Sequence, residues 1–388
     1  MNRATGMPAK PLRIAYVVQQ YPVPTQTFAQ SDIAALQDAG HTVDVFTMKP
    51  GGGDAPANRM DRPSLRTLAG LVPGRGMLAL TGWLLRHGWH RPRLLATALV
   101  CLPRADQIAR YITRGDYDVV HLFWARHTAL VPALLAARGA PVRRSVFVGA
   151  YDLVADDMLV ELAFRHAEVL FTHAEANRPY LASRAREGQR VEVVHRGIPL
   201  PDLPDDRRIQ TRWASAGALV REKGIDSVIR AFARNRGAND TLHIYGDGPQ
   251  RSDLEALAAG LGVADVVTFH GHVSREALFD RLAEAGLFLL LSTKPSERLP
   301  NVVKEALWAG CAVIASDTPG IGELLPDRRI GHVVDPADNG AIDTAIGALV
   351  AQDAATAAAN RALAREHVAR RFSAKAAMAR YAAVWNDA

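Results

Sequence analysis

The chain has 388 residues, of which 48% are hydrophobic and 22% are charged, and its formal net charge is +6 at pH 7. This composition excludes a largely disordered chain, and the lack of any apolar run of about 20 residues excludes a predicted membrane-spanning helix. The length predicts two domains, because a single hydrophobic core rarely serves more than about 300 residues.

The first half of the chain alternates between short apolar runs and segments with helical spacing. Residues 12–18 predict a buried strand, residues 28–39 predict a helix, and residues 42–47 predict a second strand. Gly40 stands where that helix would stop. Further strands are predicted at residues 118–122, 145–148, 169–172 and 191–194.

A segment rich in Pro and Asp at residues 198–206 predicts a domain boundary. Beyond it, strands are predicted at residues 212–215, 241–245, 266–270, 287–291, 312–316 and 331–334. Helices are predicted at residues 226–234, 250–261 and 275–285, and at least two more within residues 354–387. We therefore predict an N-terminal domain over residues 1–200, a second domain over residues 207–371, and a C-terminal helix over residues 372–388 that packs back on the first domain.

The alternation of strands and helices predicts an α/β protein with two Rossmann-like, doubly wound parallel-sheet domains. In such sheets, ligands bind in the crevice beyond the carboxyl ends of the strands. We expect the two domains to face one another across a cleft, with the chemistry in the loops that follow the strands.

The most informative loop and helix lie within residues 296–316. Pro300 suits a first helical turn, where its missing N–H is harmless, and Gly310 stands at the helix stop. The N-terminus of such a helix presents backbone N–H groups and partial positive charge, so a phosphate is the expected ligand. Glu297 and Glu305 have the spacing E-x7-E, which suits one carboxylate near the phosphates or sugar and the other near a ribose. The alternative for Glu305 is a solvated helix face.

The sequence LPNVVKEALWAGCAVIASDTPGIGELL, which begins at Leu299, resembles the donor-site signature of glycosyltransferase family 4, the retaining enzymes of GT-B architecture. GALVREKGIDSVIRAF, IYGDGPQ and FHGHVSREAL resemble three further loops of the same family, in the same order. The resemblance covers nearly the whole chain. It implies a nucleotide site formed by Lys223, Arg221, Gly246, Asp247, Gly248, Val273, Arg298, Leu299, Pro300, Asn301, Val302 and Glu305, with His272 near the base.

The N-terminal half is similar to family members of colanic acid and exopolysaccharide biosynthesis, through YPVPTQTFAQSDIAALQDAG, HLFWARHTALVPALLA and SVFVGAYDL. This resemblance places Thr25, Gln26, His121, Tyr151 and Asp152 on the acceptor side of the cleft. It implies that Glu297, Asp152 and His121 form the catalytic group. For His121, a histidine in the core or at a strand end is the alternative.

The resemblance implies transfer of a hexose from a nucleotide diphosphate sugar with retention, without a metal or a separate cofactor. The acceptor would be a surface polysaccharide precursor carried on a polyprenyl lipid. The family pattern is broken at Ala218, Arg298, Gly149, Gln26 and Arg196, so a catalytically weakened, nucleotide-binding scaffold or regulator is the alternative. A nicotinamide-dependent oxidoreductase is disfavoured, because QQYPVPTQTF replaces the Gly-rich fingerprint after the first strand.

The segment 59–114 carries ten arginines interleaved with Trp and Leu. This pattern suits an amphipathic surface on an anionic membrane, and two ordinary docking helices with a solvated Arg face are the alternative. Nucleic acid is not expected as a partner, because no nucleic-acid motif accompanies the charge. Cys101 and Cys311 form no disulfide framework, and the first ten residues lack the apolar core of a secretory signal. We therefore expect a cytoplasmic protein that can contact the inner face of the cell membrane.

Overall fold

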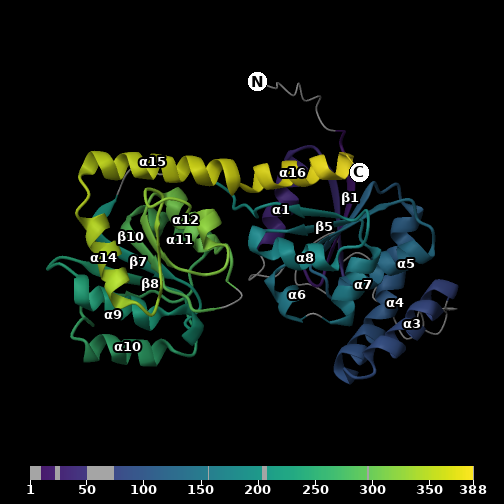
Figure 1. Cartoon of the computed structure of the whole chain (residues 1–388), viewed down its shortest axis with the longest axis horizontal. Helices are drawn as coiled ribbons and strands as arrows, with labels where there is room; N and C mark the ends of the chain where they lie inside the picture. Colours follow the sequence, from purple (N-terminus) through teal and green to yellow (C-terminus); the bar gives the residue numbers. More distant parts are fainter. Residues whose placement is uncertain are drawn as a thin grey trace. The chain divides into compact units, whose positions relative to one another are not determined.

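The computed structural model describes residues 10–21, 27–49, 74–155, 157–202, 208–294 and 297–387. Backbone contacts divide the chain into two compact units, of which the first comprises Met1–His195 with Ala374–Ala388 and the second comprises Arg196–Ser373. Each unit contains one six-stranded sheet with flanking helices (Figure 1). The prediction of two Rossmann-like parallel-sheet domains is confirmed.

The sheet of the first unit has the strand order β2-β1-β3-β4-β5-β6, and all its strand pairs are parallel. Both faces of its central strands are buried, which explains why these strands are continuous apolar runs rather than alternating ones. The strands are β1 (Arg13–Val18), β2 (Thr42–Thr47), β3 (Val119–Phe123), β4 (Arg143–Phe147), β5 (Val169–Thr172) and β6 (Arg190–Val193).

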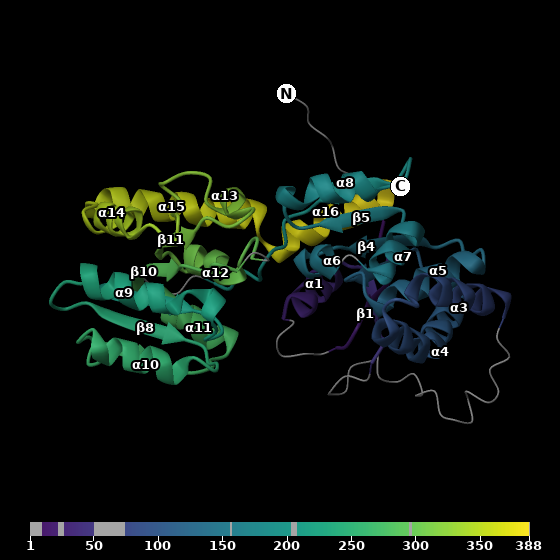
Figure 2. The same cartoon turned by 60° about the horizontal axis from the view of Figure 1, so that its bottom comes forward.

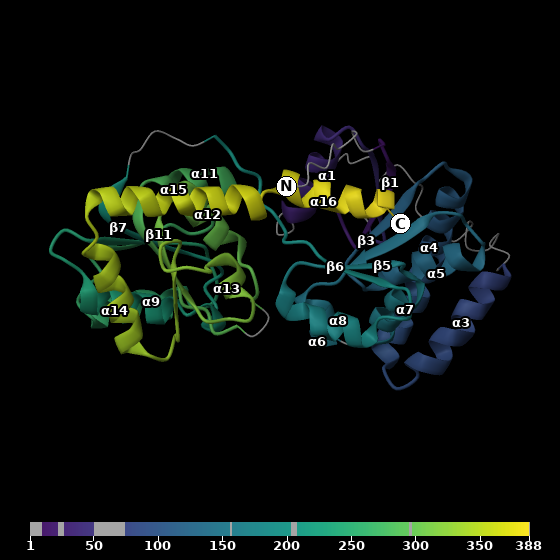
Figure 3. The ribbon, with the colours of Figure 1, turned by 45° about the horizontal axis from the view of Figure 1, so that its top comes forward.

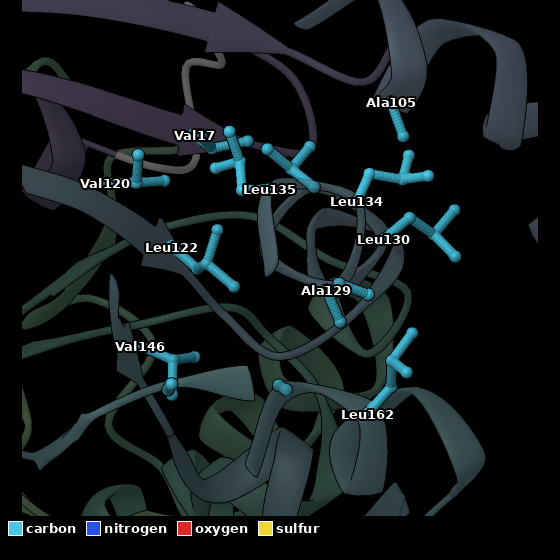
Figure 4. Packing of buried hydrophobic residues seen from close by; sticks show 14 of the residues in the cluster. Val17, Ala105, Val120, Leu122, Ala129, Leu130, Leu134, Leu135, Val146 and Leu162 are labelled. Carbon is cyan, nitrogen blue, oxygen red and sulfur yellow. The ribbon is translucent and has the colours of Figure 1, made fainter. Parts of the chain in front are cut away.

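Helices cover both faces of this sheet. They are α1 (Thr27–Asp38), α3 (Arg75–Gly88), α4 (Pro92–Arg114), α5 (Leu130–Ala137), α6 (Ala150–Ala155), α7 (Met158–His166), α8 (Arg178–Arg184) and α16 (Ala374–Asp387). One core lies between the sheet and α3, α4, α5 and α7. In Figure 4, Val17, Leu122 and Val146 come from three neighbouring strands and point toward the side of α5. Leu130 and Leu135 of α5 are fully buried in the same cluster.

The opposite face of the first sheet is covered by α1 and α16, which pack against each other. Tyr381 of α16 stacks on Phe171 with 4.0 Å between ring centroids. The indole N–H of the fully buried Trp385 donates to Ser145 Oγ at 2.9 Å. The last helix of the chain is therefore part of the core of the first unit, although more than 170 residues of the second unit separate it from β6 in sequence.

The sheet of the second unit has the strand order β12-β11-β10-β7-β8-β9, again all parallel. Its strands are β7 (Ile209–Ala216), β8 (Thr241–Tyr245), β9 (Val267–Phe269), β10 (Ala285–Leu290), β11 (Ala312–Ser316) and β12 (His332–Val334). Its helices are α9 (Ile225–Asn235), α10 (Arg251–Gly260), α11 (Arg275–Ala283), α12 (Asn301–Ala309), α13 (Ile321–Leu324), α14 (Asn339–Val350) and α15 (Ala354–Arg371). The long helix α15 packs beside α12 (Figure 3). In the described part of the chain, no helix combines the length and hydropathy needed to cross a bilayer.

The first prediction concerns the C-terminal helix. Trp385→Ala should lower the free energy of unfolding by about 3–5 kcal/mol, because it removes a buried indole and leaves a cavity against the first sheet. Trp89→Ala is the matched control, since Trp89 is 75% exposed, and it should change stability by less than about 0.5 kcal/mol. Denaturant unfolding followed by circular dichroism measures both, and equal effects would show that α16 adds little to the core.

Candidate active site

Three loops of the second unit meet at one edge of its sheet. They follow β7, β8 and β10, and β7 is hydrogen-bonded to both of the other two strands. Because the carboxyl ends of parallel strands lie at the same edge, the three loops are neighbours although up to 75 residues separate them in sequence. The resemblance assigned the nucleotide site to these loops and to the loop after β9, which carries Val273.

Glycines allow these loops to pack backbone against backbone. A Cβ on Gly246, whose φ is +129°, would lie 1.9 Å from the carbonyl oxygen of Gly217. A Cβ on Gly248 would lie 2.5 Å from the carbonyl oxygen of Leu219, and one on Gly224 would lie 2.0 Å from that of Leu291. Contacts this short exclude any side chain, so the Gly-Asp-Gly turn after β8 packs directly on the backbone of the loop after β7.

An ion pair joins two of the predicted site residues across 74 positions of sequence. The ammonium of Lys223, in the 3-10 turn Arg221–Lys223 after β7, lies 2.7 Å and 2.8 Å from the two carboxylate oxygens of Glu297, in the loop after β10. The carbonyl oxygen of Glu222 accepts the backbone N–H of Thr293 at 2.9 Å and fixes the two loops to each other. The structure therefore brings Lys223 and Glu297 into direct contact.

The helix α12 begins one residue later than predicted. Pro300 has φ −61° and ψ 128° and occupies the N-cap position rather than the first helical turn, so Asn301 is the first helical residue. The φ of Pro300 is that of a helix, but its ψ is extended, so the residue lies just before the first helical residue. Pro300, at the N-cap position, makes no side-chain hydrogen bond to the first N–H groups of α12. These groups and the helix dipole present partial positive charge beside Glu297. Burial lowers the pKa of the neighbouring Arg298.

Glu305 is paired with an arginine that the sequence analysis did not identify. Arg275 Nε, at the start of α11, donates to Glu305 Oε1 at 2.9 Å, and the Glu305 side chain is only 12% exposed. The alternative of a solvated helix face for Glu305 is therefore wrong. Arg275 follows Ser274, which caps α11 and is preceded by Val273 and His272 of the same loop. The available signal was a basic residue at a predicted helix start near the sheet edge, but only the packing of α11 on α12 reveals its partner.

The remaining predicted nucleotide residues differ in their exposure to solvent. Arg221 and Asp247 are exposed, and Val273, Asn301 and Val302 are half-buried. Leu299 is buried beside Pro300. Within the described ranges, no group of three or more His, Cys, Asp or Glu side chains has an arrangement suited to a metal ion.

Two candidate residues of the first unit, His121 and Asp152, have described side chains, one in the middle of β3 and the other in α6. His121 of β3 is 2% exposed, its Nδ1 lies 2.9 Å from Ser145 Oγ, and its ring contacts those of Tyr16, Tyr381 and Trp385. This position corresponds to the alternative of a core histidine. Thr25 and Gln26 lie outside the described residues, as does the side chain of Tyr151.

Asp152 is a buried carboxyl that connects two loops. Its Oδ1 accepts the N–H of Ala125 at 3.1 Å and its Oδ2 accepts the N–H of Gly149 at 2.9 Å. Burial raises the pKa of Asp152 to about 7, against the opposing effect of these N–H groups. Trp124, which directly precedes Ala125, has φ +72°, a strained value for a bulky residue. Strained backbone of this kind concentrates at functional sites, where surrounding contacts hold it in place.

Comparison with known proteins places this arrangement in a family. The model of the family described as Glycosyl transferases group 1 matches residues 210–366, which include all three loops of the site. The chain is 35% identical over 300 residues to the GDP-mannose-dependent alpha-(1-6)-phosphatidylinositol monomannoside mannosyltransferase of Mycolicibacterium smegmatis, covering 70% of this chain and 78% of the relative. It is 24% identical over 370 residues to the amylovoran biosynthesis glycosyltransferase AmsK of Erwinia amylovora, covering 84% and 88%.

The solved structures with this fold include a sucrose-phosphate synthase from Thermosynechococcus elongatus, with a TM-score of 0.69 and 20% identity over 97% of this chain and 98% of that one. The Anabaena protein Alr3699/HepE in complex with UDP has a TM-score of 0.67 and 17% identity, over 97% and 100%. These structures share the two-unit fold. Two parallel sheets, three glycine-packed loops and the sequence match together show that the chain is a member of the glycosyl transferases group 1 family, with the GT-B fold.

Proposed function

We propose that the protein is a retaining hexosyltransferase that takes its sugar from a nucleotide diphosphate donor and transfers it to a lipid-linked precursor of a surface polysaccharide. One observation supports this proposal above the others. Lys223 and Glu297, from different loops, meet at the loop that leads into α12, and the N-cap residue Pro300 makes no side-chain hydrogen bond to the first N–H groups of that helix. An ammonium and exposed helix N–H groups are the donors that a diphosphate requires.

The proposed reaction uses electrostatic stabilisation of the leaving group. The bond between the anomeric carbon and the β-phosphate oxygen breaks, and the nucleoside diphosphate leaves with the electron pair. An acceptor hydroxyl oxygen bonds to the anomeric carbon on the same face, and its proton passes to a phosphate oxygen of the donor. Lys223, Arg221 and the N-terminus of α12 stabilise the charge that develops on the diphosphate, so the proposal needs no metal ion. When the donor is bound, the Glu297 carboxylate no longer pairs with Lys223 and instead accepts hydrogen bonds from hydroxyl groups of the donor sugar.

The nucleoside is assigned to the side of the site formed by α11 and α12. Glu305 accepts hydrogen bonds from the ribose hydroxyls, and the hydrogen bond from Arg275 Nε orients that carboxylate. Gly246, Gly248 and Val273 line the base. GDP-mannose and UDP-glucose are the first donors to test, because one relative is named for GDP-mannose and a structural neighbour was solved with UDP-glucose.

The second prediction tests the donor site. Lys223→Ala and Glu305→Ala should each lower turnover by about 100-fold, because each removes a charged group that contacts the donor. Nucleotide release from GDP-mannose and UDP-glucose, with polyprenyl diphosphate-linked sugars as acceptors, measures this effect. Lys375→Ala, at an exposed position of α16, is the control and should retain full turnover.

Unchanged turnover in both variants would reject the donor-site assignment. A different result, nucleotide binding without transfer to any acceptor in the panel, would favour the alternative of a scaffold or regulator. Thermal shift with GDP and UDP separates the two results, since binding stabilises the folded protein by mass action whether or not transfer follows.

The lipid-linked acceptor is supported by the surface of α3 and α4, which lie side by side in the first unit (Figure 2). One side of α4 is buried in the core through Ala98, Leu102 and Ala105. Exposed apolar and basic side chains occupy other surfaces of the two helices and the turn between them, namely Arg75, Leu78, Leu85, Arg86, Trp89, Arg91, Arg93 and Val100. We propose that this surface, the α3–α4 patch, rests on an anionic membrane, where Trp and Leu enter the headgroup region and Arg contacts acidic lipids.

The third prediction concerns the α3–α4 patch. The double variant Leu85→Ser with Trp89→Ser should bind vesicles of phosphatidylcholine and phosphatidylglycerol at least about tenfold more weakly, because burying each apolar side chain contributes about 1.5–3 kcal/mol. Flotation measures the binding, which should also weaken at higher salt. Val350→Ser, which changes an exposed apolar residue of α14, should bind as the unaltered protein does. Equal binding of all three proteins would exclude the patch as the membrane surface.

For the catalytic group we propose that Asp152 acts by holding the loops after β3 and β4 on the acceptor side. Its two backbone hydrogen bonds and its burial support this role. His121 is proposed to act only indirectly, by supporting the sheet beneath those loops.

The fourth prediction follows from the raised pKa of Asp152, which is about 7 in the folded protein against an ordinary value of 3.8. Between these values the folded state binds more protons than the unfolded state. The stability contributed by this group is therefore fully present below about pH 4 and is lost as the pH rises through about 7. The free energy of unfolding should fall more steeply with pH across this window than it does in Asp152→Asn. Asp116→Asn, at an exposed position, should retain the steeper slope, and identical slopes in all three proteins would contradict the role of Asp152.

A further inference from the structure

Lys304 of α12 is a buried lysine that the proposed chemistry does not use. The residue is 1% exposed. Its ammonium donates to the carbonyl oxygen of Arg196 at 2.8 Å and to Asn301 Oδ1 at 3.0 Å, and it lies 5.6 Å from the centre of the Phe372 ring. Burying an ammonium carries a large desolvation cost, and an apolar side chain of similar size would fill the same space without it. Packing alone therefore does not explain a lysine at this position.

The partners of Lys304 lie where the chain passes between its two units. The first crossing is His195–Arg196 and the second is Ser373–Ala374. Arg196 is thus the first residue of the second unit, and Phe372 is next to its last. The N–H of Ile198 donates to the carbonyl oxygen of Phe372 at 2.8 Å, and Ile198 pairs with Ser373 in a parallel bridge. The two crossing segments are therefore hydrogen-bonded to each other, and Lys304 contacts both.

The same lysine also contacts the first residue of α12. Asn301 begins the helix whose N-terminus is proposed to bind the diphosphate. At the other end of α12, Arg208 donates to the carbonyl oxygens of Gly310 and Ala309, and Arg365 donates to those of Trp308 and Ala309. Cations at these carbonyls complement the negative end of the helix dipole. Side-chain hydrogen bonds therefore anchor α12 near both of its ends, through Lys304 in its first turn and through Arg208 and Arg365 at its last residues.

We propose that Lys304 is a positioning residue that couples occupancy of the donor site to both crossings between the units. Any rearrangement of one unit against the other must change backbone torsions at these crossings, because no other peptide bonds join the units. A diphosphate that binds the N-terminus of α12 orders Asn301, and the ammonium of Lys304 transmits this order to Arg196 and to the segment of Phe372. The inference rests on the proposed binding of a nucleoside diphosphate at α12.

Hydrogen–deuterium exchange of the full chain, with GDP and UDP as the probes, tests this coupling. In the unaltered protein, the bound nucleotide should slow exchange about tenfold both in α12 and in the crossing segments 196–202 and 368–374. In Lys304→Met the slowing in α12 should remain, whereas the crossing segments should exchange equally with and without nucleotide. The dissociation constant of the nucleotide should change by less than about threefold, which a general loss of structure would not allow. Lys375→Met, the same substitution at an exposed lysine two residues after the second crossing, should behave as the unaltered protein.

The exchange measurements distinguish the inference on Lys304 from the proposed donor site on which it rests. Slowed exchange at the crossings of Lys304→Met, equal to that of the unaltered protein, would overturn the inference and leave the proposed donor site intact. A failure of both GDP and UDP to protect α12 in the unaltered protein would overturn the inference together with the donor site. Lys304→Gln, which is neutral, polar and one atom shorter, replaces the methionine variant if that variant does not fold.

Discussion

The proposed donor site depends on the close contact of three backbone segments at one edge of the second sheet. Gly224, Gly246 and Gly248 stand where any side chain would overlap a carbonyl group of a neighbouring loop. Because the loops touch through their backbones, residues from separate parts of the chain project their side chains into one small volume. The contact of Lys223 with Glu297 is a direct result. Backbone contact of this kind restricts the relative positions of the loops, and fixed placement of charged groups is what electrostatic catalysis requires.

Both acidic residues of the E-x7-E pair are neutralised by a basic partner in the protein itself. Glu297 faces Lys223, and Glu305 faces Arg275. These ion pairs keep partly buried charges satisfied, so the folded protein avoids the cost of desolvating them alone. In the proposed reaction the phosphates of the donor replace Glu297 as the partner of Lys223. The ribose of the donor hydrogen-bonds to Glu305, which keeps its contact with Arg275. Donor binding would then replace contacts within the protein by contacts of similar strength with the donor. A donor that carries both a diphosphate and a ribose is therefore favoured over one that carries only one of these groups.

Local pattern was enough to predict most of the fold. The apolar runs predicted as strands at residues 12–18 and 241–245 contain β1 and β8, and Gly40 and Gly310, predicted as helix stops, have positive φ values of 87° and 96°. The position of Pro300 was misplaced by one residue, because proline has the same φ at the cap and in the first turn and only ψ distinguishes them.

Contacts between distant segments could not be predicted in the same way. The sequence marks Lys223 and Glu297 as separate motif residues, but their ion pair depends on the order of strands β8, β7 and β10. Arg275 was overlooked for a related reason, since a single arginine at a helix start is common and only tertiary packing reveals the carboxylate beside it. The environment of His121 likewise depends on α16, which lies about 260 residues further along the chain.

The return of α16 to the first unit has a consequence for biosynthesis. While a ribosome makes the chain, the first sheet is complete after β6, but the face that α16 covers stays open until residues 374–387 have emerged. The second unit is continuous in sequence and has all its strands and helices by Ser373. The half made later can therefore finish folding before the half made earlier, which reverses the usual N-to-C order. During that interval Phe171 and its apolar neighbours lack their cover, so nascent chains of this protein should be clients of chaperones that bind exposed apolar strands.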